Sequence, residues 1–161
     1  MLLYNREQRF GDALKIAREL QGRFPRNRLL WLEAGATEVR RKRPAEAEVE
    51  LTAGIDRLPR DHRPRSFGEE ALWYYKRGVA RVLLGNVKGA ETDPRTSLAS
   101  KGRDWVYGRA RTELGKIADL RGDRARALSE YRTAIALAEK DIDPDNAAQA
   151  QALVSTAYHK R

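Results

Sequence analysis

Side chains that could act as nucleophiles, general bases or soft metal ligands are scarce in this chain. Cysteine is absent, which excludes disulfides, cysteine nucleophiles and thiolate zinc sites. The two histidines, His62 and His159, have no partner at metal-ligand spacing, and we interpret both as surface residues. No nucleophile and base can be assembled into a pair, so we expect no catalytic site, no metal and no cofactor.

Carboxylates come closest to a metal-binding pattern. Asp141, Asp143 and Asp145 alternate as in a calcium loop, but the glycine and the terminal glutamate of that motif are missing. The alternating glutamates within residues 46–50 would be spread around a helix axis and would not pair on one side. The sequence also contains no glycine-rich loop of the kind that binds phosphates.

Composition limits the class of protein further. The 161 residues (18.3 kDa) are 41% hydrophobic and 34% charged, which is too charged for a membrane protein and too apolar for a disordered tail. The formal net charge of +9 favours acidic partners or nucleic acid. The basic excess is spread evenly along the chain, so a solvated helical surface is the plainer interpretation.

Internal repeats indicate the architecture. One ladder consists of alanines separated by 34, 43 and 37 residues: Ala13, Ala47, Ala90 and Ala127. A second ladder consists of glycines, each 12 residues before its alanine: Gly35, Gly78 and Gly115. Pro25 and Pro59 are again 34 apart. The repeating unit is therefore 34 residues long, with nine extra residues between the second and third copies and three between the third and fourth.

The residues at these positions resemble the tetratricopeptide repeat (TPR) pattern of W-x2-L-G-x2-Y, A-x3-F and P over 34 residues. The second copy contains Trp31, Ala34-Gly35, Ala47, Leu51 and Pro59, and the fourth contains Leu114-Gly115, Ala127, Tyr131 and Ala134. The third copy departs from the pattern at Pro94, which replaces the aromatic, and the fourth at Arg111. The chain resembles a bacterial-type TPR protein or a C-terminal TPR fragment.

The resemblance implies an all-α, right-handed α-solenoid of antiparallel helix pairs. We expect one domain over 1–161, with units 1–27, 28–61, 71–104 and 108–141 and a capping helix at 145–159. The expected helices are 2–8, 10–23, 28–41, 44–57, 68–84, 87–99, 104–120, 124–140 and 145–159. The sixth should kink or break at Pro94, and residues 60–68 should form an inserted loop.

The two ladders have a physical interpretation within such helix pairs. The glycines should lie where the first helix of a unit closely approaches the second, and the alanines should allow the same approach from the other side. The aromatic residue or leucine four positions after each alanine should fill the space beside them.

First helices line a concave groove in TPR arrays, which places the candidate binding residues on the stripe opposite the glycines. We predict that a partner contacts Leu29, Leu32, Ala36, Leu72, Tyr75, Val79, Val82, Arg109, Thr112 and Lys116. Tyr75 and Arg109 are the expected anchors, because tyrosine and arginine dominate binding hot spots. The groove would have an apolar floor and a basic end, suited to a peptide with hydrophobic anchors and an acidic neighbour.

Three other interpretations stay open. A tight superhelix could bury the same stripe in its own core, or a second copy of the chain could cover it in a homodimer. The arginines of residues 40–43 and 57–65 could contact phosphates, although cations at helix ends also interact favourably with the helix dipole. The lysine, asparagine and arginine positions of carboxylate-binding TPR domains are mostly Leu, Ala and Val here, so that activity is not expected.

These observations predict a non-enzymatic interaction or scaffold module for a protein or peptide partner of unknown identity. A homodimer is the alternative, binding of nucleic acid is the weaker one, and no membrane segment is expected. Residues 1–4 are too short for the apolar part of a signal peptide, which slightly favours the cytoplasm. Because no capping residue precedes Leu2, a fragment of a longer protein is an equal expectation.

Overall fold

The computed structural model describes residues 7–159 and is all-helical, with no strand in that range. It has the architecture of a TPR-like helical solenoid, in which helices pack as adjacent pairs. The fold class expected from the repeat ladders is thereby confirmed. The first expected helix, 2–8, falls almost wholly outside the described residues, and residues 7–8 form a turn.

The chain divides into two compact units between Arg65 and Ser66, inside the loop expected at 60–68. We call them unit 1 and unit 2 and describe each by itself.

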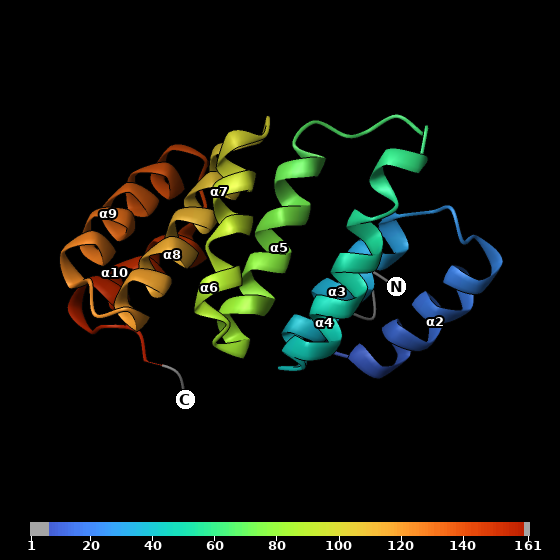
Figure 1. Cartoon of the computed structure of the whole chain (residues 1–161), viewed down its shortest axis with the longest axis horizontal. Helices are drawn as coiled ribbons and strands as arrows, with labels where there is room; N and C mark the ends of the chain where they lie inside the picture. Colours follow the sequence, from blue (N-terminus) through green and yellow to red (C-terminus); the bar gives the residue numbers. More distant parts are fainter. Residues whose placement is uncertain (1–6, 160–161) are drawn as a thin grey trace. The chain divides into compact units, whose positions relative to one another are not determined.

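The described part of unit 1, residues 7–65, contains three α-helices and a 3-10 turn (Figure 1). They are α2 (Phe10–Arg23), α3 (Leu29–Arg40), α4 (Pro44–Ile55) and η1 (Leu58–Arg60). Helix α3 packs against both α2 and α4, and Leu14, Ala17 and Ala34 form a buried apolar cluster. Pro44 begins α4 because its fixed φ suits the first helical position, where its missing N–H is not needed.

Unit 2 also consists of helices that pack against one another (Figure 1). They are α5 (Glu69–Leu84), α6 (Val87–Ala90), α7 (Thr92–Ala99), α8 (Asp104–Leu120), α9 (Arg124–Lys140) and α10 (Pro144–Ser155). Helix α8 packs against α9, α9 against α10, and α5 against α7 and α8. The expected bounds of α8 and α9 are confirmed to the residue.

Two expectations for unit 2 need correction. The sixth helix is broken into α6 and α7 at Glu91, three residues before Pro94, so that Pro94 falls in the first turn of α7, where proline is tolerated. The last helix ends at Ser155 and not at 159, since Thr156 adopts an extended conformation. Residues 156–159 therefore lie outside the helix.

The same N-cap recurs along unit 2. The side chains of Asn86, Asp123 and Asp143 each accept a hydrogen bond from the backbone N–H three residues later. Such a cap satisfies one of the backbone donors that a helix start leaves without a partner. These short-range bonds explain why the local sequence is enough to predict where α6, α9 and α10 begin.

The glycine ladder marks the closest approaches between paired helices, as the sequence predicts. A Cβ atom on Gly35 would lie 2.5 Å from Leu51 Cγ, and one on Gly78 would lie 3.0 Å from Pro94 Cδ. On Gly115 it would lie 2.6 Å from Tyr131 Cδ1. Each partner follows its glycine by 16 residues, so Pro94 occupies the place of the aromatic in the third repeat. The alanines of the ladder are fully buried.

Candidate protein-binding surface

The ten partner-binding residues predicted from the sequence fall in both units. Three are on α3 in unit 1, where Leu29 is exposed while Leu32 and Ala36 are buried. The other seven are on α5 and α8 of unit 2.

The α5 residues surround the apolar core of unit 2. Tyr75 is buried, 7% exposed, in a cluster with Ala71 and Val106, and Leu72 and Val79 pack half-buried against that cluster. Val82 is 1% exposed and belongs to a second cluster with Ala90, Leu114 and Ile117. Tyr75 and Val82 are therefore core residues of unit 2, whereas Leu72 and Val79 reach its surface.

Aromatic and cationic side chains meet where α5 and α8 adjoin. The rings of Tyr75 and Trp105 pack edge to face, with centroids 6.5 Å apart and an interplanar angle of 87°. The Arg109 guanidinium lies 5.5 Å from the centre of the Trp105 ring, within cation–π distance. Trp105 packs half-buried against the Tyr75 cluster, as Leu72 and Val79 do. We call the four accessible side chains around Tyr75 the Tyr75 rim: Leu72, Val79, Trp105 and Arg109.

Arg109 is held in place by the start of α10. Its Nε donates to Asp143 Oδ2 at 2.6 Å and its Nη2 donates to Asp143 Oδ1 at 2.8 Å, so both carboxylate oxygens are engaged. Two parallel charge-assisted bonds are stronger and more directional than one. The arginine bonds lower the pKa of Asp143, an effect that its partial burial opposes. The side chain of Arg109 remains 32% exposed and can still meet a partner.

The other two predicted polar residues of α8 are buried. Thr112 Oγ1 donates to Asn146 Oδ1 at 2.9 Å, and Lys116 Nζ donates to Glu113 Oε1 at 2.7 Å. Burial alone would lower the pKa of Lys116, but the Glu113 carboxylate outweighs it and the pKa is raised. Glu113 Oε2 is buried and has no hydrogen-bond partner among the described residues. Both side chains thus serve contacts within unit 2.

A contact that the sequence reasoning missed lies at the end of α8. Asp119 is 1% exposed at its side chain and accepts hydrogen bonds from Tyr131 Oη at 2.8 Å and from Arg124 Nη1 at 3.0 Å. It also accepts a bond from the backbone N–H of Tyr158 at 2.8 Å. No local pattern reveals that Asp119 and Tyr158, which are 39 positions apart, meet there.

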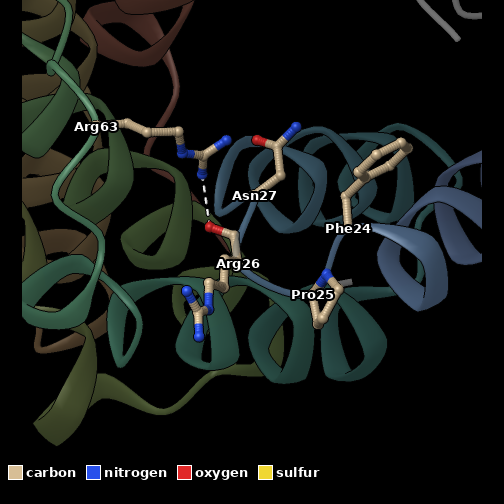
Figure 2. Close-up of a pocket in the computed structure, with 5 residues that line it drawn as sticks. All are labelled: Phe24, Pro25, Arg26, Asn27 and Arg63. Atoms are coloured by element: carbon tan, nitrogen blue, oxygen red, sulfur yellow. Dashed lines mark hydrogen bonds between the residues drawn. The ribbon is translucent and has the colours of Figure 1, made fainter.

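Unit 1 has a pocket at the turn between α2 and α3 (Figure 2). Its volume is about 380 Å³, and it is lined by Phe24, Pro25, Arg26, Asn27 and Arg63. Figure 2 shows the Arg63 guanidinium beside the turn, where its Nη2 donates to the Arg26 carbonyl at 2.6 Å. Phe24 is 51% exposed. The pocket lies on an exposed turn and is lined by one aromatic ring and two arginine side chains. Its lining residues include no acid–base pair.

The loop after η1 is fastened to the start of α3 by a buried ion pair. Arg28 is 1% exposed, and its Nη1 lies 2.7 Å from Asp61 Oδ2 while its Nη2 donates to the Pro64 carbonyl at 3.2 Å. Hydrogen bonds from Arg63 and Arg28 hold the pKa of Asp61 far below its ordinary value, although burial opposes this. These arginines therefore organise the loop, and a phosphate would compete with Asp61 for them.

Within residues 7–159 no group of three His, Cys, Asp or Glu side chains could hold a metal ion. Among the same residues, no helix is both long and apolar enough to cross a membrane.

Comparison with known proteins supports the fold. No family model and no curated protein matches the sequence. Among solved structures, the chain is similar to the crystal structure of MamA, a TPR-containing protein. The TM-score is 0.67 with 19% sequence identity, over 91% of this chain and 87% of that one. The fold is therefore TPR-like.

Proposed function

We propose that the protein is a non-enzymatic interaction module that binds an extended or helical protein segment at the Tyr75 rim. The observation that supports this is the grouping of three half-buried apolar side chains around one buried tyrosine, with an arginine stacked over one of them. Aromatic and arginine side chains over a packed base are typical of interface hot spots, because a partner can exclude water from them.

The chemistry of the rim indicates what the partner segment contains. Leu72, Val79 and Trp105 suit hydrophobic anchors, whose transfer from water is worth about 25 cal/mol per Å² of buried apolar surface. Arg109 and Lys76 favour an acidic residue beside those anchors, and Lys76 Nζ lies 5.7 Å from the centre of the Tyr75 ring. Asp143 already pairs with Arg109. We therefore expect apolar contacts to supply most of the affinity for the partner segment, and charged contacts to set the orientation of that segment.

A capture experiment with two matched substitutions tests this proposal. Wild-type protein, Val79→Glu and Val49→Glu serve as baits in nuclease-treated lysate of the source organism, and retained proteins are identified by mass spectrometry. Val49 is 69% exposed on α4 and is not a rim residue, so it provides the same change at another exposed position. We expect a partner that wild type and Val49→Glu retain and that Val79→Glu loses. Circular dichroism melting verifies that all three baits are folded.

The same baits decide between this proposal and the alternatives. Retention of the same proteins by all three baits, or of none, contradicts binding at the rim. Light scattering that shows a wild-type dimer and a Val79→Glu monomer would make the rim a homodimer face. Capture that depends on omitting the nuclease and falls steeply with salt would indicate nucleic acid.

A further inference from the structure

Residues 156–159, which follow α10, lie on unit 2 as a short segment. After α10 ends at Ser155, Thr156 is extended, and residues 157–159 have no regular secondary structure. In Figure 1 the segment leads from α10 towards the C mark, and the half-buried Tyr158 contacts the C-terminal end of α8 through Asp119. We call residues 156–159 the tail.

The tail is held on unit 2 by the side chain of Tyr158 and by one hydrogen bond from its backbone N–H. The Tyr158 ring packs against the apolar cluster of Val82, Ala90, Leu114 and Ile117. Lys116 Nζ lies 5.6 Å from the centre of the same ring, and the Tyr158 N–H donates to Asp119 Oδ2 at 2.8 Å. These residues of α5, α6 and α8 form what we call the Tyr158 seat.

The seat is built without help from the tail. Asp119 is oriented by Tyr131 Oη and Arg124 Nη1, both on α9, and Lys116 is held by Glu113. Val82, Leu114 and Ile117 form one cluster with Ala90, and the helices α5, α6 and α8 that carry them contact one another directly. Arg124 Nη2 donates to the carbonyls of Leu153 and Val154, which secures the end of α10 rather than the tail beyond it. If the tail leaves, we expect the Asp119 carboxylate, the Lys116 ammonium group and the apolar cluster around Val82 to stay in position.

We propose that the Tyr158 seat is an exchangeable docking site for an extended peptide with an aromatic anchor, and that the tail is its resident intramolecular ligand. The tail itself specifies the partner's chemistry: a tyrosine or phenylalanine whose ring lies under Lys116 and whose own N–H faces Asp119. Such a peptide must displace residues 156–159 in order to bind. The inference deepens the proposed interaction function, but it concerns the far end of α8 and not the Tyr75 rim.

A titration with the tail as a synthetic peptide tests the exchange. The receptor is the chain truncated after Ser155, and the probe is acetylated Thr156–Arg161 with a fluorophore, followed by fluorescence anisotropy. We expect saturable binding to the truncated chain and at least about tenfold weaker binding to the full chain, because the attached tail is present at a high effective concentration. A full-length Tyr158→Ala protein should bind the peptide as the truncated chain does, and it replaces that receptor if truncation prevents folding.

Two altered peptides distinguish specific binding at the Tyr158 seat from non-specific adsorption. Tyr158→Ala in the peptide removes the anchor, and N-methylation of Tyr158 removes the donor to Asp119. Each should weaken binding about tenfold, the usual effect of losing an anchor or a charge-assisted hydrogen bond. Equal binding to full and opened chains, no binding to either opened chain, or indifference to both peptide changes overturns the inference. The Val79→Glu capture is independent of these results, so either proposal can fail alone.

Discussion

Tyr131 lies directly over Gly115, and a Cβ atom on that glycine would come within 2.6 Å of the tyrosine ring atom Cδ1. The ring is fully buried, and its hydroxyl is bonded to Asp119. It therefore cannot move aside without breaking that bond. The first prediction follows from this contact.

Gly115→Ala should destabilise unit 2 by about 1–2 kcal/mol, since overpacking exceeds the gain in helix propensity. Gly78→Ala is the matched comparison, because its Cβ would lie 3.0 Å from Pro94 Cδ and needs only a small adjustment. Urea denaturation measures both variants. A Gly115→Ala protein as stable as Gly78→Ala would show that Tyr131 can reposition.

Arg28→Ala should loosen the loop between η1 and α5. The change removes one of the two arginines that pair with the buried Asp61 carboxylate. Because Arg63 still donates to both carboxylate oxygens, the expected cost is about 2 kcal/mol, below that of leaving a buried charge unpaired. Limited proteolysis should then cut within residues 58–65 of the variant well before it cuts wild type. Exposed Arg60 offers Arg60→Ala as the control, and equal cleavage of both variants would contradict the role of Arg28.

Glu91 lies at the break between α6 and α7, and its side chain forms ion pairs that connect this break with the following repeat. Its carboxylate pairs with Arg126 at 2.5 Å, with Arg95 at 2.7 Å and with Arg121. Hydrogen bonds from Arg126, then from Arg121 and Arg95, lower the Glu91 pKa to about 2, against the opposing effect of burial.

The sign of the pH effect follows from that lowered pKa. The ordinary value of 4.5 lies above the folded-state value, so the charged carboxylate stabilises the fold above about pH 4.5 and this stabilisation is lost as the pH falls towards 2. Glu91→Gln should lower stability by about 1 kcal/mol at pH 7, as expected for an ion-pair network near the surface. The difference from wild type should disappear near pH 2 in thermal melts. Glu139→Gln, the same substitution at an exposed position of α9, is the control.

Asp143 has two roles that substitution can separate. It caps α10 by accepting from the Asn146 N–H at 3.3 Å, and it pairs with Arg109 of α8. Asp143→Ala removes both and should cost about 2 kcal/mol, whereas Asp143→Asn keeps a capping acceptor and should cost less. Hydrogen exchange of the α10 amides reports the difference. Asp145→Ala at an exposed position of the same helix is the control, and equal exchange in all variants would contradict both roles.

The sequence alone determined the helix pairs and their closest contacts. Hydrophobic periodicity, N-caps and helix-starting prolines act over a few residues, so α8 and α9 could be bounded correctly from local pattern. The glycine and alanine ladders revealed the packing face because two helices can approach closely only where side chains are small. Pro94 was recognised as a substitute for the aromatic, but the break at Glu91 depends on how α6 and α7 pack.

The tertiary structure decided which stripe residues are accessible. Sequence spacing put Tyr75 and Thr112 in a groove, yet their burial depends on neighbours many positions away, Val106 and Asn146. The pairing of Arg109 with Asp143 and the seat of Tyr158 on Asp119 join residues 34 and 39 positions apart. No local pattern encodes such contacts, because they form only when successive helix pairs stack and bring distant side chains within reach of one another.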